Sequence, residues 1–133
     1  MFGPLTTAIN ALLVLCVAAA PWITRRGFGV WGYWGRSALG IGLAVALAEG
    51  GKRWQVWPGH PGFPSGHETL CLAAATCLAA RDPRWLRLGL PLSALQAWAL
   101  VRGGFHAPVE VAGALLSGPP VALLCQMWGR RGG

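Results

Sequence analysis

The chain alternates between apolar stretches and short polar connections. Predominantly apolar runs extend over residues 4–23, 33–50, 67–80, 86–101 and 108–127. Such runs are typical of transmembrane helices, which need about 20 mostly apolar residues to cross a bilayer. The pattern predicts an all-α, polytopic transmembrane helix bundle of about five spans, formed by residues 1–133 as a single membrane-embedded domain.

The third run is shorter than a full span. Only twelve residues separate Glu68 from Arg81, against about 20 for a complete crossing. We expect this helix either to draw on residues 64–67 before it or to lie partly buried among the others. Kinks are expected at Pro91 and at Pro119 and Pro120, which lie inside the fourth and fifth runs.

The composition also favours a membrane protein. Hydrophobic residues make up 54% of the chain and charged residues 11%, whereas soluble domains carry about 25% charged residues. The net charge of +7 does not indicate nucleic-acid binding, because the basic residues lie at the ends of the apolar runs and form no cluster. The four cysteines fall within apolar runs, where small buried side chains are expected instead of disulfides or zinc ligands.

The positive charges predict the orientation of the five spans. One face collects eight of the eleven basic residues: Arg25, Arg26, Arg36, Arg81, Arg84, Arg87, Arg130 and Arg131. The opposite face has only Lys52, Arg53 and Arg102. The positive-inside rule then places the N-terminus outside and the C-terminus in the cytoplasm, and we expect a bacterial inner membrane. Seven tryptophans lie near the ends of the runs, as in an interfacial aromatic belt, and Trp98 is expected to be buried within a span.

Nearly all acid–base side chains gather on the outer, periplasmic face. All three histidines are there, together with three of the four acidic residues: His60, His67, His106, Glu49, Glu68 and Glu110. Because the orientation was derived from Lys and Arg alone, the shared location of the histidines is independent information. It indicates a functional site on that face.

Two short segments that contain His67, His106 and Glu110 lead into predicted helices. Gly62-Phe-Pro-Ser-Gly-His67 leads into the third helix, and His106-Ala-Pro-Val-Glu110 leads into the fifth. A neutral imidazole is a competent nucleophile when a carboxylate holds its other nitrogen, and Glu110 lies one helical turn after His106. Ser65 and Gly66 stand at the start of the third helix, where free N–H groups and the helix dipole favour a phosphate.

These residues carry a family resemblance over residues 52–116. Pro64-Ser65-Gly66-His67 follows Lys52 and precedes Arg102, His106 and Glu110, an order that resembles the type 2 phosphatidic acid phosphatase (PAP2) family. The run His106-Ala-Pro-Val-Glu-Val-Ala-Gly-Ala-Leu-Leu116 is similar to that family's third motif entering its last helix. The resemblance implies a helical membrane phosphatase that works through a phosphohistidine intermediate.

The resemblance also implies the role of each site residue. His106 would attack phosphorus, and His67 would protonate the leaving oxygen and later activate water. Glu110 would hold His106. Lys52 and Arg102 match the family's phosphate-binding cations, to which Ser65 and Gly66 add N–H donors. No metal or other cofactor is implied.

The implied partners are the bilayer and a lipid phosphate substrate. Phosphatidic acid and undecaprenyl pyrophosphate both fit, because the residues recognise the headgroup and not the tail. Self-association into a homo-oligomer stays open.

Departures from the family pattern keep two alternatives open. The family's first-motif arginine would stand at Gly59 and its third-motif arginine at Leu100, whereas Arg102 lies only four residues before His106. The first alternative is a catalytically inactive relative that binds lipid phosphate or serves as a structural membrane subunit. The second is a metal-binding membrane protein that uses the three histidines with Glu68 or Glu110. The roles of His60 and Arg53 stay open.

The start of the third helix also has a purely structural interpretation. Ser65-Gly-His-Glu68 fits a capping box. In that arrangement the Ser65 hydroxyl accepts from the N–H of Glu68, and the Glu68 carboxylate reaches back to the N–H of Ser65.

Overall fold

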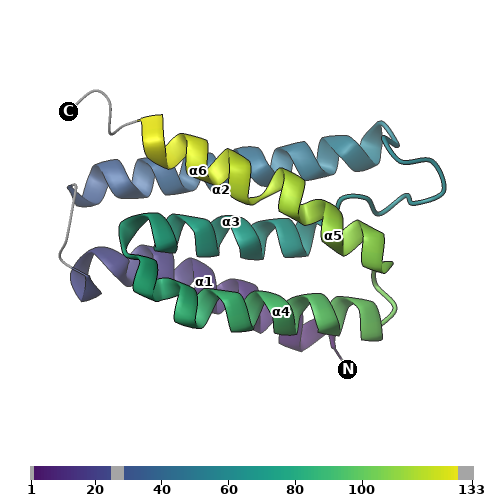
Figure 1. Ribbon diagram of the computed structural model, residues 1–133, viewed down its shortest axis with the longest axis horizontal. Helices are drawn as coiled ribbons and strands as arrows, with labels where there is room; N and C mark the ends of the chain where they lie inside the picture. The colour runs from purple at the N-terminus through teal and green to yellow at the C-terminus, as the bar shows by residue number, and fades with distance from the viewer. Residues whose placement is uncertain (1, 25–28, 129–133) are drawn as a thin grey trace.

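The computed structural model of the chain describes residues 2–24 and 29–128. The helices are α1 (Gly3–Ile23), α2 (Val30–Arg53), α3 (Gly66–Arg81), α4 (Leu86–Arg102), α5 (Pro108–Ser117) and α6 (Pro119–Trp128), with a short 3₁₀ turn, η1 (Pro83–Trp85), before α4 (Figure 1). Within the described ranges the chain forms helices and no strand. The prediction of an all-α bundle is confirmed, and each expected run corresponds to one helix or, in the last case, to a broken one.

The last run bends where the sequence contains two prolines. α5 ends at Ser117 and α6 begins at Pro119, with Gly118 between them. Neither Pro119 nor Pro120 can donate a main-chain hydrogen bond, so the helix is interrupted there. The expected kink at this pair is confirmed, whereas Pro91 lies inside α4, which continues as one helix.

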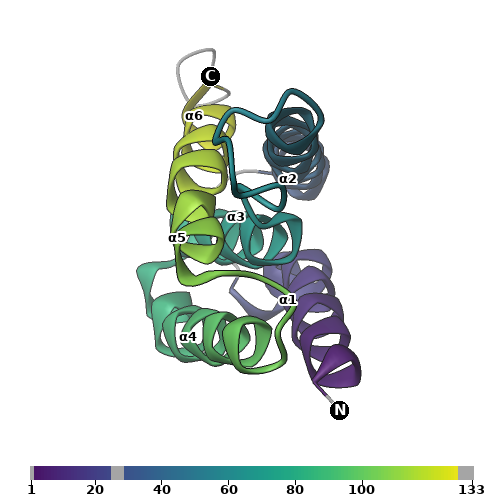
Figure 2. The same cartoon turned by 90° about the vertical axis from the view of Figure 1, so that its right-hand side faces the viewer.

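α3 is the central helix of the bundle. It packs against every other helix, and the end-on view shows it among α1, α2, α4 and α5 (Figure 2). Eight of its sixteen residues are buried. The short third helix therefore lies partly buried, as expected, and it starts at Gly66 instead of extending back through residues 64 and 65.

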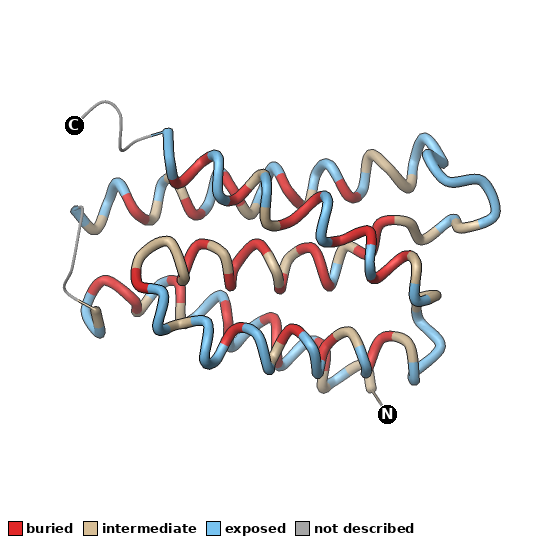
Figure 3. The backbone as a smooth tube through the Cα atoms, viewed as in Figure 1, coloured by how far each residue is buried: buried red, intermediate tan, exposed pale blue. Residues whose placement is uncertain are grey.

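Small side chains make up much of the interior, and most leucines face outward; Leu13, Leu78 and Leu100 are the buried exceptions among the described residues. Ala44, Ala74 and Ala114 are fully buried, whereas Leu116 is 73% exposed and Leu124 is 67% exposed. Buried positions recur along the inner side of each helix (Figure 3). A water-soluble bundle has the opposite arrangement, with leucines in its core and polar residues on its surface.

Polar side chains join the helices across this small-residue interior. The Gln126 amide on α6 donates to Ser37 Oγ on α2 at 2.8 Å. The hydroxyls of Thr69 on α3 and Ser117 on α5 lie 2.7 Å apart. Close contacts between small residues, supplemented by such hydrogen bonds, are how helices associate where the surroundings are apolar.

Two segments are long and apolar enough to cross a membrane. They are α1 and the stretch Pro108–Trp128, each of 21 residues, which corresponds to about 31 Å of helix. α3 and α4 are shorter, with 16 and 17 residues, and α2 is less apolar. Length and composition thus identify two of the five expected spans.

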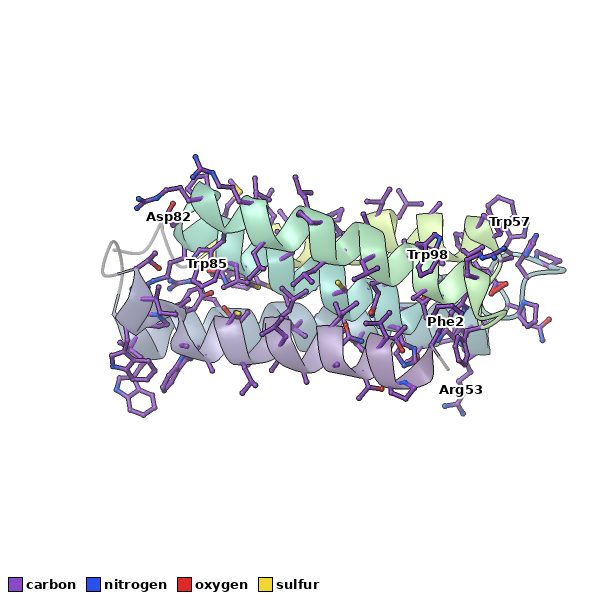
Figure 4. All side chains as sticks on the ribbon, turned by 90° about the horizontal axis from the view of Figure 1, so that it is seen from below. Phe2, Arg53, Trp57, Asp82, Trp85 and Trp98 are labelled. Carbon is purple, nitrogen blue, oxygen red and sulfur yellow. The ribbon has the colours of Figure 1, made fainter. Side chains whose placement is uncertain are left out.

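The two faces expected from the charged residues are the opposite ends of the bundle. Phe2, Arg53, Trp57 and Trp98 are near one end, and Asp82 and Trp85 are at the other (Figure 4). All three histidines belong to the first end, because the 54–65 and 103–107 connections and the start of α3 meet there (Figure 1). Four of the arginines that predicted the orientation, Arg25, Arg26, Arg130 and Arg131, lie outside the described residues.

One aromatic residue differs from expectation. Trp98 is 52% exposed, and its ring packs edge to face on Phe2 with centroids 5.4 Å apart. The prediction that it is buried within a span is wrong, because α4 turns this residue outward near its C-terminal end. Three of the cysteines, Cys71, Cys77 and Cys125, are buried as expected, whereas Cys16 is half-buried.

Candidate functional site

A histidine and a carboxylate form the core of the candidate site. His106 Nδ1 lies 3.0 Å from Glu110 Oε1, and their side chains are 11% and 9% exposed. Pro108 starts α5 between them, which places Glu110 in the first turn, one turn beyond His106. The N–H of His106 donates to the carbonyl oxygen of Leu100 and so ties the loop to α4. The spacing of four residues predicted this contact correctly.

A second histidine approaches the same carboxylate. His60 Nδ1 lies 3.6 Å from Glu110 Oε2. The loop that carries it is folded by main-chain hydrogen bonds from His60 to Trp57 and from Phe63 to His60. Trp57 also packs against the rings of Phe63 and His60. Glu110 therefore meets a different histidine on each of its oxygens, a contact that the sequence spacing did not reveal.

Gly62 allows this loop to lie against the pair. A methyl group at Gly62 would collide with the Glu110 carboxylate and would lie 2.9 Å from His106 Nδ1. Only glycine fits such a close approach without moving its neighbours. Gly62 stands beside the Pro-Ser-Gly-His segment in the sequence, but the local pattern did not indicate this role.

The start of α3 is capped differently from a full capping box. The Ser65 hydroxyl accepts from the N–H of Glu68 at 3.3 Å, as expected. The N–H of Ser65, however, donates to the carbonyl oxygen of Glu110 at 2.8 Å. Glu68 therefore does not complete the predicted box, because the main chain of α5 occupies its target.

The first turn of α3 keeps two donors for an anion. The N–H of Glu68 is taken by Ser65, whereas those of Gly66 and His67 have no partner among the described residues. These groups carry the positive end of the helix dipole. The N–H of Ser65, which was also expected to donate to a phosphate, is occupied by the carbonyl oxygen of Glu110, whereas that of Gly66 is not. Phosphate binding at this helix start stays a prediction.

Lys52 lies beside this helix start but is already paired. Its Nζ is 2.9 Å from Glu49 Oε1. A methyl group at Gly66 would lie 2.7 Å from that oxygen and 3.1 Å from Nζ. The glycine thus lets the pair from α2 come against the N-terminus of α3. Lys52 was predicted as a site residue, whereas its pairing with Glu49 was not predicted.

These groups line one cavity of about 240 Å³, which we call the His67 cavity. Its lining residues are Asn10, Val45, Glu49, Lys52, Gly66, His67 and Leu70. The His67 side chain is exposed, and its ring lies within electrostatic range of His106, Lys52 and Glu49. The structure therefore brings Ser65, Gly66, His67 and Lys52 to one helix start, with the His106 and Glu110 pair next to it.

A polar network behind His67 was not predicted. The Gln96 amide nitrogen on α4 donates to Asn10 Oδ1 at 3.0 Å and to the carbonyl oxygen of His67 at 3.2 Å. Asn10 is seven residues past the start of α1, and Gln96 is six residues before the end of α4. α1 and α4 therefore extend about 9–10 Å beyond the start of α3. Asn10 and Gln96 are isolated polar residues within apolar runs, which was the available sequence signal.

Arg102 lies in a different cavity from Lys52. It is exposed at the C-terminal end of α4 and lines a groove with Glu68, Trp98 and Pro108. This groove runs beside α4 and α5. Arg102 is six residues beyond Gln96, so it stands about 9 Å further out along α4 than the level of His67. Its predicted part in phosphate binding stays a prediction.

The arrangement does not gather the three histidines around one point. His60 and His106 meet at Glu110, whereas His67 belongs to its own cavity. Among residues 2–24 and 29–128, no group of three or more His, Cys, Asp or Glu side chains is placed to hold a metal ion. His67, at the start of α3, lies within electrostatic range of His106. Two histidines this close, one of them held by a carboxylate, can support nucleophilic and acid–base chemistry on an anion.

Known proteins add no assignment to this geometry. Comparisons of the chain with models of protein families, with curated proteins and with solved structures found no match.

Proposed function

We propose that this chain is a membrane-embedded phosphatase that hydrolyses a lipid phosphate or a polyprenyl pyrophosphate through a phosphohistidine at His106. The observation that carries the proposal is the 3.0 Å contact between His106 Nδ1 and Glu110 Oε1. A carboxylate on Nδ1 leaves the lone pair of Nε2 free and orients the ring. The resemblance of residues 52–116 to the PAP2 family supports the same assignment.

In the first step, Nε2 of His106 attacks phosphorus. The nitrogen–phosphorus bond forms as the bond to the leaving oxygen breaks, and protonated His67 gives its proton to that oxygen. Glu110 stabilises the positive charge that develops on the His106 ring. Lys52 and the N–H groups of Gly66 and His67 offset the charge on the phosphoryl oxygens.

In the second step, water replaces the histidine. Neutral His67 takes a proton from the water as its oxygen attacks phosphorus, and the bond to Nε2 breaks. Inorganic phosphate is released, and both histidines return to their starting states. One imidazole thus serves as acid and then as base.

The bilayer setting rests on the outward leucines and the small-residue interior. In water the exposed leucines would form apolar surface far beyond that of a soluble monomer. In lipid the same surface is the favourable one, and hydrogen bonds such as that of Gln126 with Ser37 hold the helices together. We propose five spans in a bacterial inner membrane, with the N-terminus and the site on the periplasmic side.

The test is phosphate release by purified protein in detergent with EDTA. Short-chain phosphatidic acid and a polyprenyl pyrophosphate are the two substrates, and His106→Ala is the test variant. Phe105→Ala is the matched control, because Phe105 is the exposed neighbour of His106. Release that persists in EDTA, disappears in His106→Ala and continues in Phe105→Ala is the expected result. No release from either lipid by folded protein would contradict the proposal.

A lipid-phosphate-binding protein without turnover is the second candidate. Two observations favour it: Lys52 is paired with Glu49, and Arg102 lines a separate groove. Both reduce the free positive charge in the His67 cavity, and binding a phosphate group needs less of that charge than stabilising a transition state does. Saturable binding of labelled phosphatidic acid that Lys52→Ala weakens, without phosphate release, would establish this candidate.

A further inference from the structure

A second groove is separate from the His67 cavity. It has a volume of about 630 Å³ and is bordered by α3, α4 and α5; we call it the α4–α5 groove. Apolar side chains make up most of its lining, among them Leu72, Leu90, Trp98, Val111 and Leu115. Leu90, Trp98 and Leu115 are more than half exposed, so the groove opens on the lateral surface of the bundle.

A carboxyl group lines this apolar groove. Glu68 is only 3% exposed, and its Oε2 has no hydrogen-bond partner. The hydroxyl of Ser93 also lines the groove, but its hydrogen-bond partner is Cys71 Sγ, at 3.5 Å. A buried acceptor without a donor costs about 1–3 kcal/mol. Such an exception in an otherwise hydrogen-bonded interior points to a ligand that supplies the donor.

The residues around Glu68 favour an uncharged donor group over a charged one. Arg102 is the basic residue that lines the groove, and it repels an amine. Bringing an ammonium and a carboxylate together in apolar surroundings also costs the hydration of both charges. A hydroxyl group avoids this cost, because it is uncharged and can donate to either carboxyl oxygen. The apolar lining requires the rest of the ligand to be a hydrocarbon chain.

We propose that the α4–α5 groove binds a single-chain lipid alcohol, whose hydroxyl group donates to Glu68 and whose chain lies along α4 and α5. Hydrolysis of a phosphate monoester of a single-chain lipid would leave an alcohol of this class, so for such a substrate the groove would hold the product, whereas phosphatidic acid would leave a two-chain diacylglycerol and a polyprenyl pyrophosphate would leave a polyprenyl phosphate. That last link rests on the proposed function. Binding of the alcohol itself does not.

The experiment is photo-crosslinking of the full chain in detergent. The probe is dodecanol with a diazirine near the end of its chain. Matched probes carry the same diazirine on dodecane, dodecylamine and dodecyl phosphate. Peptide mapping locates the label, and unlabelled dodecanol competes for it. The expected result is saturable labelling of α4 and α5 by the alcohol, at least tenfold stronger than labelling by the alkane.

Substitutions at Glu68 separate hydrogen bonding from packing. Glu68→Gln keeps an acceptor oxygen and is expected to retain labelling within about threefold. Glu68→Leu removes both oxygens and is expected to lower labelling about tenfold, the effect of losing one hydrogen bond worth about 1.4 kcal/mol. Leu124→Ala, on the outward face of α6, is the matched control and should label as the parent does.

A second variant keeps Glu68 and fills the groove. Ala97 lines the α4–α5 groove and is half-buried, so Ala97→Trp should abolish labelling while circular dichroism shows a folded helical protein. Equal labelling by alkane and alcohol, stronger labelling by the amine or the phosphate, or labelling that survives Ala97→Trp would each overturn the proposal. Phosphate release is not measured here, so failure of this proposal is distinct from failure of the proposed function.

Discussion

The main-chain N–H of Ser65 donates to the carbonyl oxygen of Glu110 at 2.8 Å. This bond joins the segment that enters α3 to the first turn of α5, although 44 residues of chain separate them. It therefore sets the distance between the helix start that offers N–H donors and the carboxylate that holds His106. The main chain, and not a side chain, defines this part of the site.

Substitutions at Ser65 should distinguish the effect of its hydroxyl bond with Glu68 from the effect of its main-chain bond with Glu110. Ser65→Ala removes the hydroxyl cap and is expected to cost about 1 kcal/mol of stability, with a small effect on phosphate release. Ser65→Pro fits the φ of −64° at this position but removes the N–H, so release should fall much further. Thermal unfolding and initial rates, measured on both variants, test this. Equal rates for the two would contradict the role of the main-chain bond.

Glu110→Gln should lower the rate without unfolding the protein. The amide is isosteric but cannot stabilise the positive ring of His106, so kcat should fall roughly 10²–10⁴-fold. KM should change little, because Glu110 does not contact the phosphate. Steady-state kinetics give both values. A change in KM alone would show that Glu110 acts in binding.

Gly62→Ala should disturb the His106 and Glu110 pair. The added methyl group would collide with the carboxylate, and a displacement of about 1 Å costs up to roughly 10²-fold in rate. Gly42→Ala is the control, because a side chain there meets open space. That control should keep its activity and gain up to about 1 kcal/mol of helix stability. Similar activity in the two variants would refute the close packing at Gly62.

The hydroxyl pair of Thr69 and Ser117 should couple α3 to α5. A double-mutant cycle with Thr69→Val and Ser117→Ala is expected to give a coupling energy of about 0.6 kcal/mol and at most about 1.7 kcal/mol. Thr76→Val with Ser117→Ala is the control cycle, because Thr76 bonds only within α3, to Leu72. Unfolding in a detergent titration measures both cycles. Additive effects in the first cycle would remove this bond as a link between the helices.

Cysteine labelling should report the orientation. Gln55→Cys lies in the exposed connection near the histidines, and Arg84→Cys lies in the exposed turn at the other end. A membrane-impermeant maleimide should label the first in intact cells and the second only after permeabilisation. The native cysteines give little background, since none of the four is exposed. The reverse pattern would invert the proposed topology, and labelling of both in intact cells would refute the spanning bundle.

Local pattern was sufficient to predict the helices and one contact of the site. Apolar runs end where charges and glycines begin, so the five helical regions were predictable. The spacing of His106 and Glu110 within one turn predicted their contact, because it depends on a single helix. The break at Gly118 followed from two prolines in the same way.

Contacts between distant segments were not predictable from pattern. The approach of His60 to Glu110, the pairing of Gln96 with Asn10 and the capture of the Ser65 N–H by α5 all depend on how the helices pack. The outward turn of Trp98 was missed because a run that is apolar on all sides gives no indication of which face is buried. Arg102 was grouped with Lys52 by sequence order, whereas the length of α4 beyond Gln96 separates them.

The extension of α1 and α4 past the start of α3 has an electrostatic consequence. In the proposed bilayer, the N–H donors of Gly66 and His67 would lie below the outer ends of two neighbouring helices, where the dielectric constant is far lower than in bulk water. The attraction between a helix terminus and an anion grows as the dielectric constant falls, and dissolved ions screen it less. A phosphate held at this depth would therefore be bound nearly as strongly at high ionic strength as at low ionic strength.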